Sequence, residues 1–592
     1  MKSALLHALL ALLACSPATP SVRAAEPASP WGIASSASGA KNIGEWLPRV
    51  HDAGVGTVRL FPEWRTVEPR QGQWNWDKAD ALVRAASDNQ VELTAPLMGS
   101  VPWSSEKIHT FPMSDLAAWS GFVREAVARY KGRIHRWEVW NEGNGGFNDG
   151  RHTTTDYARL AAATYTAAKQ ADPSAQVALT TASFDPAYLH QALLAQQAAG
   201  TPAQFDFLAI HPYELADGIS SPNGEIPYLW MTRLLRDLLK KSAPTKADAD
   251  IWITEIGRNL AHRKDQPVAE REAAAALVKL YVMALAQGIR GVQWFEGQDP
   301  AGEEPGFGLL KRDGTPRASY HAFKTMTATL GAAPKYLGWL ALGAGGRAFG
   351  FAFQNQGNPV LVAWKGVGDA GQSVTFDTDV QILSLTAAAK QTRAAGQPLA
   401  LGNEPVFISG LPPALVTQAI ANRDRNFPWG GDFSKTKTVS TQLGVVPPTT
   451  RSGAPTNVGV FHAGRPSAPK VTFADGTSGM LMSANQSAQF HVHPTFAAIH
   501  TREYFVRLTV RRVTPGNVGM NLLYEIADSQ GRSPYKNVGT WFSLAKDDGW
   551  QTHTWQVKDA CFAKMWGYDL SFAPEQSQPF VIGKVEVSTE KF

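Results

Sequence analysis

Short apolar runs alternate with longer amphipathic stretches between Trp31 and about Lys324. The amphipathic stretches, at residues 77–87, 115–130, 155–170, 186–197 and 269–287, carry apolar residues at helical spacing. Strands that alternate with helices are typical of a parallel sheet built from βα units. Because eight such units match a TIM barrel, we predict an α/β fold with a (β/α)8 barrel over residues 28–328. The predicted strands cover residues 32–35, 57–61, 92–98, 136–140, 176–181, 205–211, 250–254 and 291–295.

The pattern changes after Pro334, where short β-rich segments follow one another. Segments 347–353, 359–364, 373–376, 381–385 and 406–409 predict a small β-sandwich over residues 333–425. A polar stretch at 446–456, which contains Pro, Thr and Ser, is typical of a linker. Further strands at 504–513, 519–528, 549–557 and 581–587 predict a jelly-roll-like β domain over residues 455–592.

The first residues have the three regions of an export signal. Met1-Lys2 precedes an apolar run at residues 4–14, and small residues follow up to Ala24-Ala25. We therefore expect residues 1–24 to be a signal peptide and the mature protein to be periplasmic or secreted. The less favoured alternative is a lipid anchor at Cys15, because Leu12-Leu13-Ala14-Cys15 resembles a bacterial lipobox. No other stretch approaches the roughly 18 apolar residues of a spanning helix, so we expect no membrane span.

Composition and charge argue against several classes of protein, among them nucleic-acid-binding proteins and metalloproteins. With 44% hydrophobic and 18% charged residues, the chain is typical of a globular protein, and its 19 Trp supply flat faces that can stack on sugar rings. The net charge of +5 is spread without a Lys/Arg block, which argues against nucleic-acid binding. After cleavage Cys561 alone remains, which excludes an internal disulfide. Because the sequence has no metal-ligand spacing and no phosphate-binding glycine loop, we expect no metal and no cofactor.

Two carboxylates follow predicted strands of the barrel. The fourth strand is followed by Asn141-Glu142-Gly143-Asn144, and the seventh by Glu255-Ile256-Gly257. Active sites of TIM barrels lie where the strands end, so Glu142 and Glu255 are expected to share one site. A pair of carboxyl groups is what glycoside cleavage needs, because one protonates the leaving oxygen and the other attacks the sugar or activates water.

This arrangement resembles the clan A glycoside hydrolases, a group of retaining barrel enzymes, over residues 31–324. Within the clan, the early barrel resembles glycoside hydrolase family 39 and related families, which include β-xylosidases, α-L-iduronidases and endoglycosidases from exopolysaccharide operons. The motifs that carry this likeness are Val58-Arg59-Leu60, Trp64, Val67-Glu68-Pro69, Gln71-Gly72, Trp74-Asn75-Trp76 and Asp77.

The resemblance implies roles for individual residues. Glu142 would be the acid/base and Glu255 the nucleophile. Asn141 would bind the 2-hydroxyl of the sugar, and Arg59 would lie beside Glu255 and keep it ionised. Gly143 departs from the common Asn-Glu-Pro pattern, which leaves the substrate open.

The resemblance also implies supporting residues near the pair. His211-Pro212-Tyr213 would hold the nucleophile in its orientation, although a core histidine is the alternative for His211. Trp294 would lie under the reactive sugar, with barrel packing as the alternative, and Trp103 is a second candidate platform.

Other acidic residues are expected to be structural. We expect Glu63, Glu68, Glu138 and Glu296 to form ion pairs or caps. Asp299 is expected in a loop turn, with the substrate rim as the alternative.

The sequence thus predicts a retaining glycosidase that acts on a polysaccharide or oligosaccharide. Its two carboxyl groups should lie about 5–5.5 Å apart. Glu142, being shielded from water, should have a raised pKa. The alternatives are a transglycosylase that remodels a surface polysaccharide, and a non-catalytic glycan-binding or scaffold protein in which the domain at 455–592 binds the glycan. The sugar, its linkage and endo or exo action stay open.

Overall fold

The computed structural model describes residues 29–592 except for 105–106, 262, 302–305, 387–389, 448–455, 464–468, 498–501, 515–518, 527–534, 547–548, 563–567 and 575–577. The predicted signal peptide and Cys15 lie outside these residues, and so does most of the predicted linker. Among the helices of the described part, none is long and apolar enough to cross a membrane.

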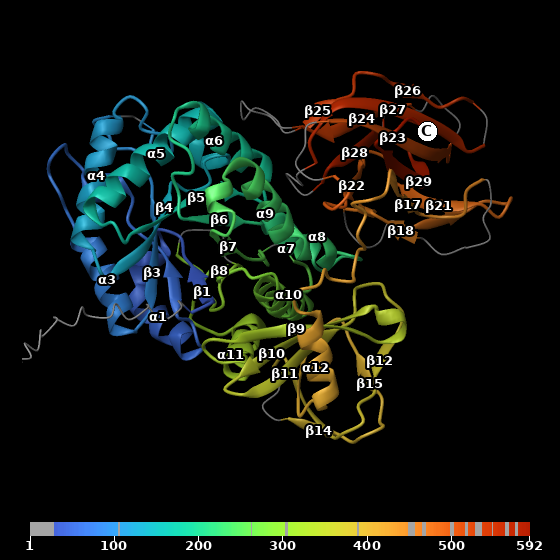
Figure 1. The fold of residues 1–592 in the computed structure, drawn as a ribbon, viewed down its shortest axis with the longest axis horizontal. Coiled ribbons are helices and arrows are strands. Elements are labelled where there is room, and N and C mark those ends of the chain that lie inside the picture. Colours follow the sequence, from blue (N-terminus) through green and yellow to red (C-terminus); the bar gives the residue numbers. More distant parts are fainter. Residues whose placement is uncertain are drawn as a thin grey trace, which may run out of the picture.

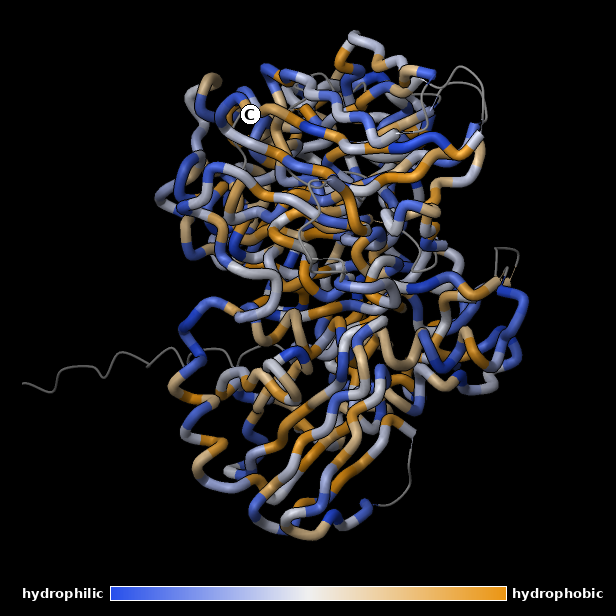
Figure 2. Tube along the Cα trace, turned by 90° about the vertical axis from the view of Figure 1, so that its right-hand side faces the viewer, coloured by the Kyte–Doolittle hydropathy of each residue, from blue (hydrophilic) through white to orange (hydrophobic). Residues whose placement is uncertain are grey.

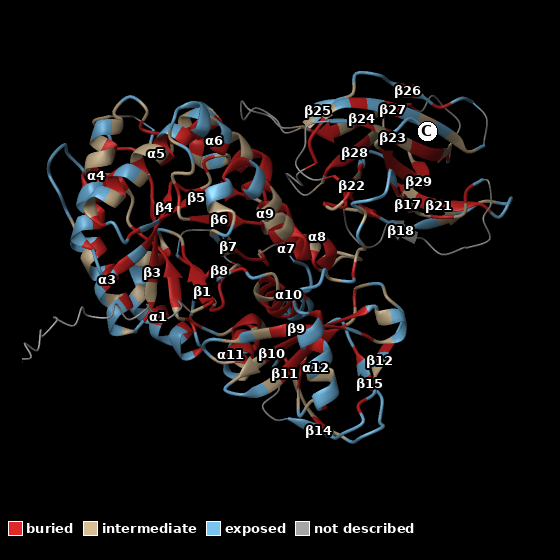
Figure 3. Cartoon of the chain, in the orientation of Figure 1, coloured by how far each residue is buried: buried red, intermediate tan, exposed pale blue. Residues whose placement is uncertain are grey.

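The first half of the chain forms a closed barrel of eight parallel strands in sequence order (Figure 1). The predicted strands are confirmed to within two residues at either end. Apolar side chains fill the interior, and Figure 3 shows buried residues along the strands, with exposed residues on the outer faces of the helices. The strands are β1 (Trp31–Ala34), β2 (Thr57–Arg59), β3 (Glu92–Leu97), β4 (Ile134–Val139), β5 (Gln176–Ala182), β6 (Phe207–His211), β7 (Asp250–Ile256) and β8 (Val292–Phe295).

Helices surround the barrel and begin at recognisable capping residues. In α5, the side chain of Thr153 accepts from the backbone of Asp156 while Asp156 accepts from that of Thr153, which satisfies two backbone donors. Asp115, Asp185 and Asp265 cap three others. The helices are α1 (Ile43–Asp52), α2 (Trp64–Val67), α3 (Asp77–Asp88), α4 (Leu116–Arg129), α5 (Thr154–Ala171), α6 (Pro186–Ala198), α7 (Tyr213–Gly218), α8 (Glu225–Leu229), α9 (Met231–Ser242), α10 (Gln266–Ala286) and α11 (Ala318–Leu330).

A small β domain follows the barrel, as predicted. Its antiparallel sheet has the order β14-β13-β16-β11-β10-β9, and β12 pairs with β15. The strands β9, β14 and β15 were not predicted. Its elements are β9 (Lys335–Leu342), β10 (Ala348–Asn355), β11 (Asn358–Trp364), β12 (Gln372–Val374), β13 (Val380–Ser384), β14 (Gln391–Arg393), β15 (Leu399–Leu401), β16 (Val406–Ser409) and the helix α12 (Pro413–Asn422).

The C-terminal domain has two antiparallel sheets that share one apolar core, which agrees with the predicted β domain. It begins earlier than expected, because β17 pairs with β29 near the other end of the chain. One sheet holds β17 (Thr438–Gln442), β18 (Thr456–Val458), β20 (Lys470–Thr472), β21 (Ser478–Met482), β23 (Arg502–Arg512), β27 (Gln551–Ala560) and β29 (Phe580–Ser588). The other holds β19 (Val460–His462), β22 (Ala488–Val492), β24 (Gly519–Glu525), β25 (Tyr535–Asn537), β26 (Phe542–Ser543) and β28 (Leu570–Pro574).

The C-terminal domain is docked on the barrel by aromatic contacts. The ring of Trp230, between α8 and α9, meets the edge of His493 with 4.7 Å between ring centroids. Phe461, in β19, is buried within the apolar cluster that fills the barrel. Hydrophobic positions accordingly run through the interior of the molecule, while hydrophilic ones gather in the outer loops (Figure 2).

Candidate active site

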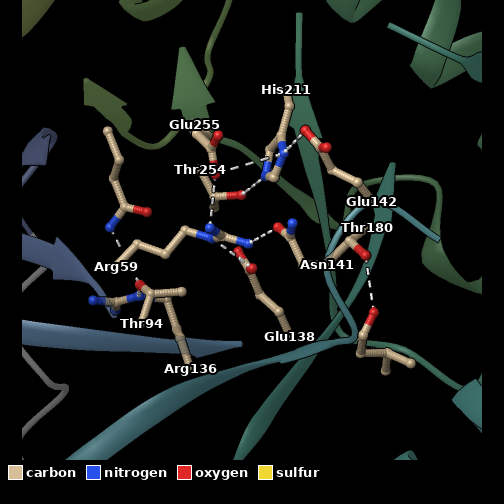
Figure 4. A network of polar contacts seen from close by, with 12 residues as sticks. Arg59, Thr94, Arg136, Glu138, Asn141, Glu142, Thr180, His211, Thr254 and Glu255 are labelled. Atoms are coloured by element: carbon tan, nitrogen blue, oxygen red, sulfur yellow. Dashed lines mark hydrogen bonds and ion pairs between the residues drawn. The ribbon is translucent and has the colours of Figure 1, made fainter. Parts of the chain in front are cut away.

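Arg59, the last residue of β2, links the ends of three barrel strands (Figure 4). It donates from Nε to Glu138 Oε2 at 2.7 Å, from Nη1 to Glu255 Oε2 at 2.9 Å and from Nη2 to Asn141 Oδ1 at 2.6 Å. Burial disfavours its charge, but the carboxylates of Glu138 and Glu255 raise the pKa of Arg59 overall. Arg59 is therefore a fixed cation that positions one carboxylate and one amide of the candidate site.

Glu255 lies one residue before the end of β7. Its Oε2 accepts from Arg59, and its Oε1 accepts from the hydroxyl of Tyr213 at 2.7 Å. Burial, followed by the charge of Glu255, raises the pKa of Tyr213 well above its ordinary value, so this hydroxyl stays a neutral donor. Arg59 and Tyr213 thus lie beside Glu255, as expected.

Glu142 projects from a sharp turn after β4. Trp140 and Glu142 have φ of 65° and 48°, in the left-handed region that side chains rarely adopt. A Cβ on Gly143 would lie 2.9 Å from the ring of Phe111 and 3.1 Å from the hydroxyl of Tyr188. The packing of this turn thus explains why glycine replaces the proline of the common pattern.

His211 contacts Glu142 and not Glu255. Its Nδ1 lies 2.9 Å from Glu142 Oε1 and 4.0 Å from Glu255 Oε2, and its Nε2 lies 3.1 Å from Thr254 Oγ1. The expectation that His211 holds Glu255 is therefore corrected, because the hydroxyl of Thr254 fixes the ring with Nδ1 toward Glu142. Tyr213 alone of the His-Pro-Tyr segment bonds Glu255.

The environment of Glu142 differs from the one predicted. Burial alone would raise the pKa of Glu142, but the hydrogen bond and charge of His211, together with the charge of Arg59, lower it overall. The prediction of a raised pKa for Glu142 in the free protein was wrong, because the sequence did not reveal that His211 faces this carboxyl group.

The two glutamates lie close together in a partly water-exposed position. One carboxylate oxygen of Glu142 and one of Glu255 lie within 4.8 Å of each other, and His211 supplies a nitrogen within the same distance. The side chains of Glu142 and Glu255 are 18% and 15% exposed, so a ligand can reach both.

Glu142, His211 and Glu255 also have the spacing of metal ligands, but the fixed charge of Arg59, 2.9 Å from Glu255, opposes a cation there. The arrangement suits proton transfer and nucleophilic attack.

The predicted tryptophan platforms do not line this pair. Trp294 is 1% exposed and donates from Nε1 to the carbonyl of Phe307, so its face is covered by the barrel. Trp103 packs edge-on against Trp64, and none of its described contacts reaches the glutamates. Phe307, which is half-buried, instead meets the edge of Tyr213 with 6.2 Å between centroids. Phe307 was missed because it lies in the irregular segment after β8, where no periodicity marks it.

The other acidic residues take part in polar contacts, and for Glu138 and Glu63 these are the ion pairs that were expected. Glu138 pairs with Arg59, and Glu68 accepts from Trp64 Nε1 and from the backbone of Gly72. Asp299 accepts from the backbone of Gly306 and Gly308 and pairs with Arg317, which assigns it to the loop and not to a substrate rim. Glu63 lies 3.6 Å from His109, and Glu296 accepts from Ser36.

Two carboxyl groups near the site were not predicted: Asp185 bonds the turn after β4, and Glu214 bonds the segment after β5. Asn144 donates to Asp185 Oδ2 at 2.7 Å and accepts from the backbone of Ala182 at 2.7 Å. Glu214, next to Tyr213, accepts from the backbone of Phe184. Burial raises the pKa of both Asp185 and Glu214 to about 7. They carry no sequence motif, so only the fold reveals them.

Part of the chain is similar in sequence to known glycoside hydrolases. Residues 61–184, which include Asn141 and Glu142, match the model of glycosyl hydrolase family 10. Endo-1,4-beta-xylanase 3 of Hypocrea jecorina (strain QM6a) is 30% identical over 154 residues, which covers 23% of this chain and 40% of that protein. This chain therefore spans less than half the length of the relative that it matches.

A solved structure of a glycosidase shares the fold. A family 39 glycoside hydrolase from the gut symbiont Bacteroides cellulosilyticus WH2 superposes with a TM-score of 0.52 and 19% identity, over 64% of this chain and 80% of that one. A GH39 β-xylosidase from Caulobacter crescentus gives 0.48 and 20% identity, over 65% and 96%. Residues 61–184 are thus similar in sequence to glycosyl hydrolase family 10, and the chain shares its fold with the family 39 glycoside hydrolase.

Proposed function

We propose that this chain is a retaining glycoside hydrolase that cuts a polysaccharide or oligosaccharide, with Glu255 as nucleophile and Glu142 as acid/base. The observation that carries the proposal is the pair of carboxylates with oxygens within 4.8 Å of each other. Retaining enzymes hold their carboxyl groups about 5–5.5 Å apart, whereas inverting enzymes need about 6.5–9.5 Å to admit water. The short spacing supports double displacement.

The surroundings of the two glutamates support this division of roles. Arg59 and Tyr213 both donate to Glu255, which holds its carboxylate in place and fixes its direction of attack. In the first step, Glu255 attacks the anomeric carbon while Glu142 protonates the departing glycosidic oxygen. In the second step, Glu142 removes a proton from water, the water oxygen attacks the same carbon, and Glu255 is released.

His211 adjusts Glu142 for the second step. The lowered pKa of Glu142 in the free protein favours the ionised form, which is the base that activates water. A sugar that covers Glu142 excludes water from it and raises its pKa again, which favours the acid needed in the first step.

Asn141 and Phe307 are suited to hold the sugar. Asn141 Oδ1 accepts from Arg59, and no described residue accepts from its Nδ2, which leaves a donor for the 2-hydroxyl group. Phe307 offers an aromatic face beside Tyr213. Because the sequence relative is named a xylanase, xylan and xylo-oligosaccharides are the first substrates to test.

We also propose export, on the basis of residues 1–24 alone.

The test is replacement of each glutamate, with hydrolysis of aryl glycosides and of a polysaccharide panel as the readout. Glu255→Gln should lower turnover by ~10³-fold or more, because the nucleophile is lost. Glu142→Ala should be rescued by azide, with a β-azide product that reports retention. The matched control is Glu125→Gln, on the exposed face of α4.

Wild-type turnover in Glu255→Gln would contradict the proposal. Transfer of the glycosyl group to a second sugar uses the same carboxylates, and product analysis separates it from hydrolysis.

A further inference from the structure

A cavity of about 720 Å³ lies between the barrel and the C-terminal domain. On the barrel side its lining includes Gly257, Phe307 and Tyr213, and Tyr213 donates a hydrogen bond to Glu255, which itself does not line the cavity. On the other side it is lined by residues of β19 and β22, among them His462 and Gln489. Its size is within the range of about 300–1,000 Å³ that is usual for ligand sites.

The C-terminal wall of this cavity is held in place by buried contacts. Trp230 meets His493 at 4.7 Å between centroids, and Phe461, which directly precedes His462, is buried against the barrel. Gly430 lies so close to both domains that a Cβ there would be 2.5 Å from Ile226 and 3.2 Å from His493. The wall is therefore a fixed part of the cavity.

The neutral part of the lining suits hydroxyl groups. Burial lowers the pKa of His462 to about 4, so its imidazole is uncharged at neutral pH and can both donate and accept. Gln489 adds a half-buried amide. Together with the half-buried ring of Phe307, these groups have the chemistry that sugars require.

Arg258, three residues after Glu255, is the unusual member of the lining. It is 4% exposed, its Nη1 donates to Ser220 Oγ at 2.6 Å, and its Nε has no partner in the described part of the chain. It forms no ion pair with a described residue, although Asp217 and Glu272 also line the cavity and reach solvent. Burial lowers the pKa of Arg258, and the charges of Asp217 and Glu272, which form no ion pair with it, offset this only in part. A carboxylate bound directly to the guanidinium would therefore reduce the cost of burying its charge.

We propose that this cavity is the continuation of the substrate cleft, that the C-terminal domain forms its far wall, and that Arg258 binds the carboxylate of an acidic sugar there. The inference rests on the proposed function, since it names the substrate class of the same site. It assigns the C-terminal domain a direct part in substrate recognition.

The test uses Glu255→Gln protein, so that binding is measured without turnover. The probes are oligosaccharides of four to six units from polygalacturonate, alginate and glucuronoxylan, each compared with its carboxyl-reduced counterpart by calorimetry. At least one acidic probe should bind about 10- to 100-fold more tightly than its reduced form, the usual range for hydrogen bonds to a charged group. If no acidic probe binds more tightly than its reduced form, or none binds, the proposal is wrong.

Variants locate the effect. Adding Arg258→Gln should abolish the preference for the acidic probe, whereas Arg124→Gln, an exposed control on α4, should leave it intact. Gln489→Ala should weaken binding of acidic and reduced probes alike. If Arg258→Gln does not fold, Arg258→Lys is the alternative. Lysine keeps the charge but cannot donate two parallel hydrogen bonds to one carboxylate, so it should reduce the preference several-fold. If the Arg258→Gln protein folds and still prefers the acidic probe, the assignment of the carboxylate to Arg258 is wrong.

Hydrolysis by the unmodified protein is measured separately. Turnover without a preference for carboxylates would refute this inference and leave the proposed function standing. Binding of acidic probes through Arg258 without any turnover would refute the proposed function and leave this inference standing.

Discussion

At the scale of single residues, the positions of side chains at strand ends and the partners of Glu255 were predictable, but the partner of His211 was not. Arg59, Glu142 and Glu255 follow apolar runs that could only be barrel strands, so their meeting follows from the topology. The partner of His211 depends on the direction of one ring, which Thr254 sets. Local sequence carries no information on such a contact, and the pKa prediction for Glu142 was wrong for that reason.

Tyr213→Phe should lower kcat/KM about 10- to 100-fold with little change in stability. The hydroxyl donates to Glu255 at 2.7 Å, and hydrogen bonds to charged groups contribute about 1.5–3 kcal/mol. Steady-state kinetics on an aryl glycoside and thermal unfolding measure the two effects. Equal kcat/KM in both proteins would show that this bond does not act in the reaction.

His211→Ala should move the alkaline limb of the kcat/KM profile to higher pH. His211 lowers the pKa of Glu142, so its removal raises that pKa, and the protonated acid persists to higher pH. The measurement is kcat/KM between pH 4 and pH 9 for both proteins, after thermal unfolding has confirmed that the variant folds. A limb that stays in place or moves down would contradict this role of His211.

At the scale of elements, strands were easier to predict than the turns that carry function. Each barrel strand is a short apolar run between polar segments, a strong signal. The turn after β4 depends instead on left-handed residues and on contacts with Phe111 and Tyr188, which lie far away in sequence. Strand β17, with the mainly polar sequence Thr438–Gln442, was missed because its pairing with β29, not its own pattern, defines it.

Gly143→Ala should destabilise the protein by about 1–3 kcal/mol and lower activity, because the added Cβ would push Glu142 away from its partners. Gly146→Ala is the matched control in the same loop, since nothing lies within 4 Å of a Cβ there. Chemical denaturation and kcat/KM of both variants check this. Similar behaviour of the two would mean that the turn has room to relax.

At the scale of the whole molecule, three domains were predicted from changes in pattern, but their docking was not. The barrel and the small β domain meet at a buried ion pair, in which Lys279 of α10 donates to Glu225 of α8 at 2.8 Å. Trp364, in β11, donates to the same carboxylate at 3.3 Å. Apolar periodicity gives no indication of a buried charge pair between two helices, so α10 was predicted only as a helix.

Lys279→Met should cost about 3–5 kcal/mol in the free energy of unfolding, because it leaves the charge of Glu225 buried and unpaired. The double variant Glu225→Gln/Lys279→Met removes both charges and should recover most of that loss. Urea unfolding of the single and double variants gives both values. A single variant as stable as the wild type would show that water reaches this pair.

The pairing of β29 with β17, β21 and β23 bears on how the protein is made. The barrel has all its strands once β8, which ends at Phe295, has left the ribosome. The C-terminal domain lacks a central strand until residues 580–588 are synthesised. A chain cut short before this strand would still contain both glutamates of the barrel, but the domain beside them would have no complete sheet.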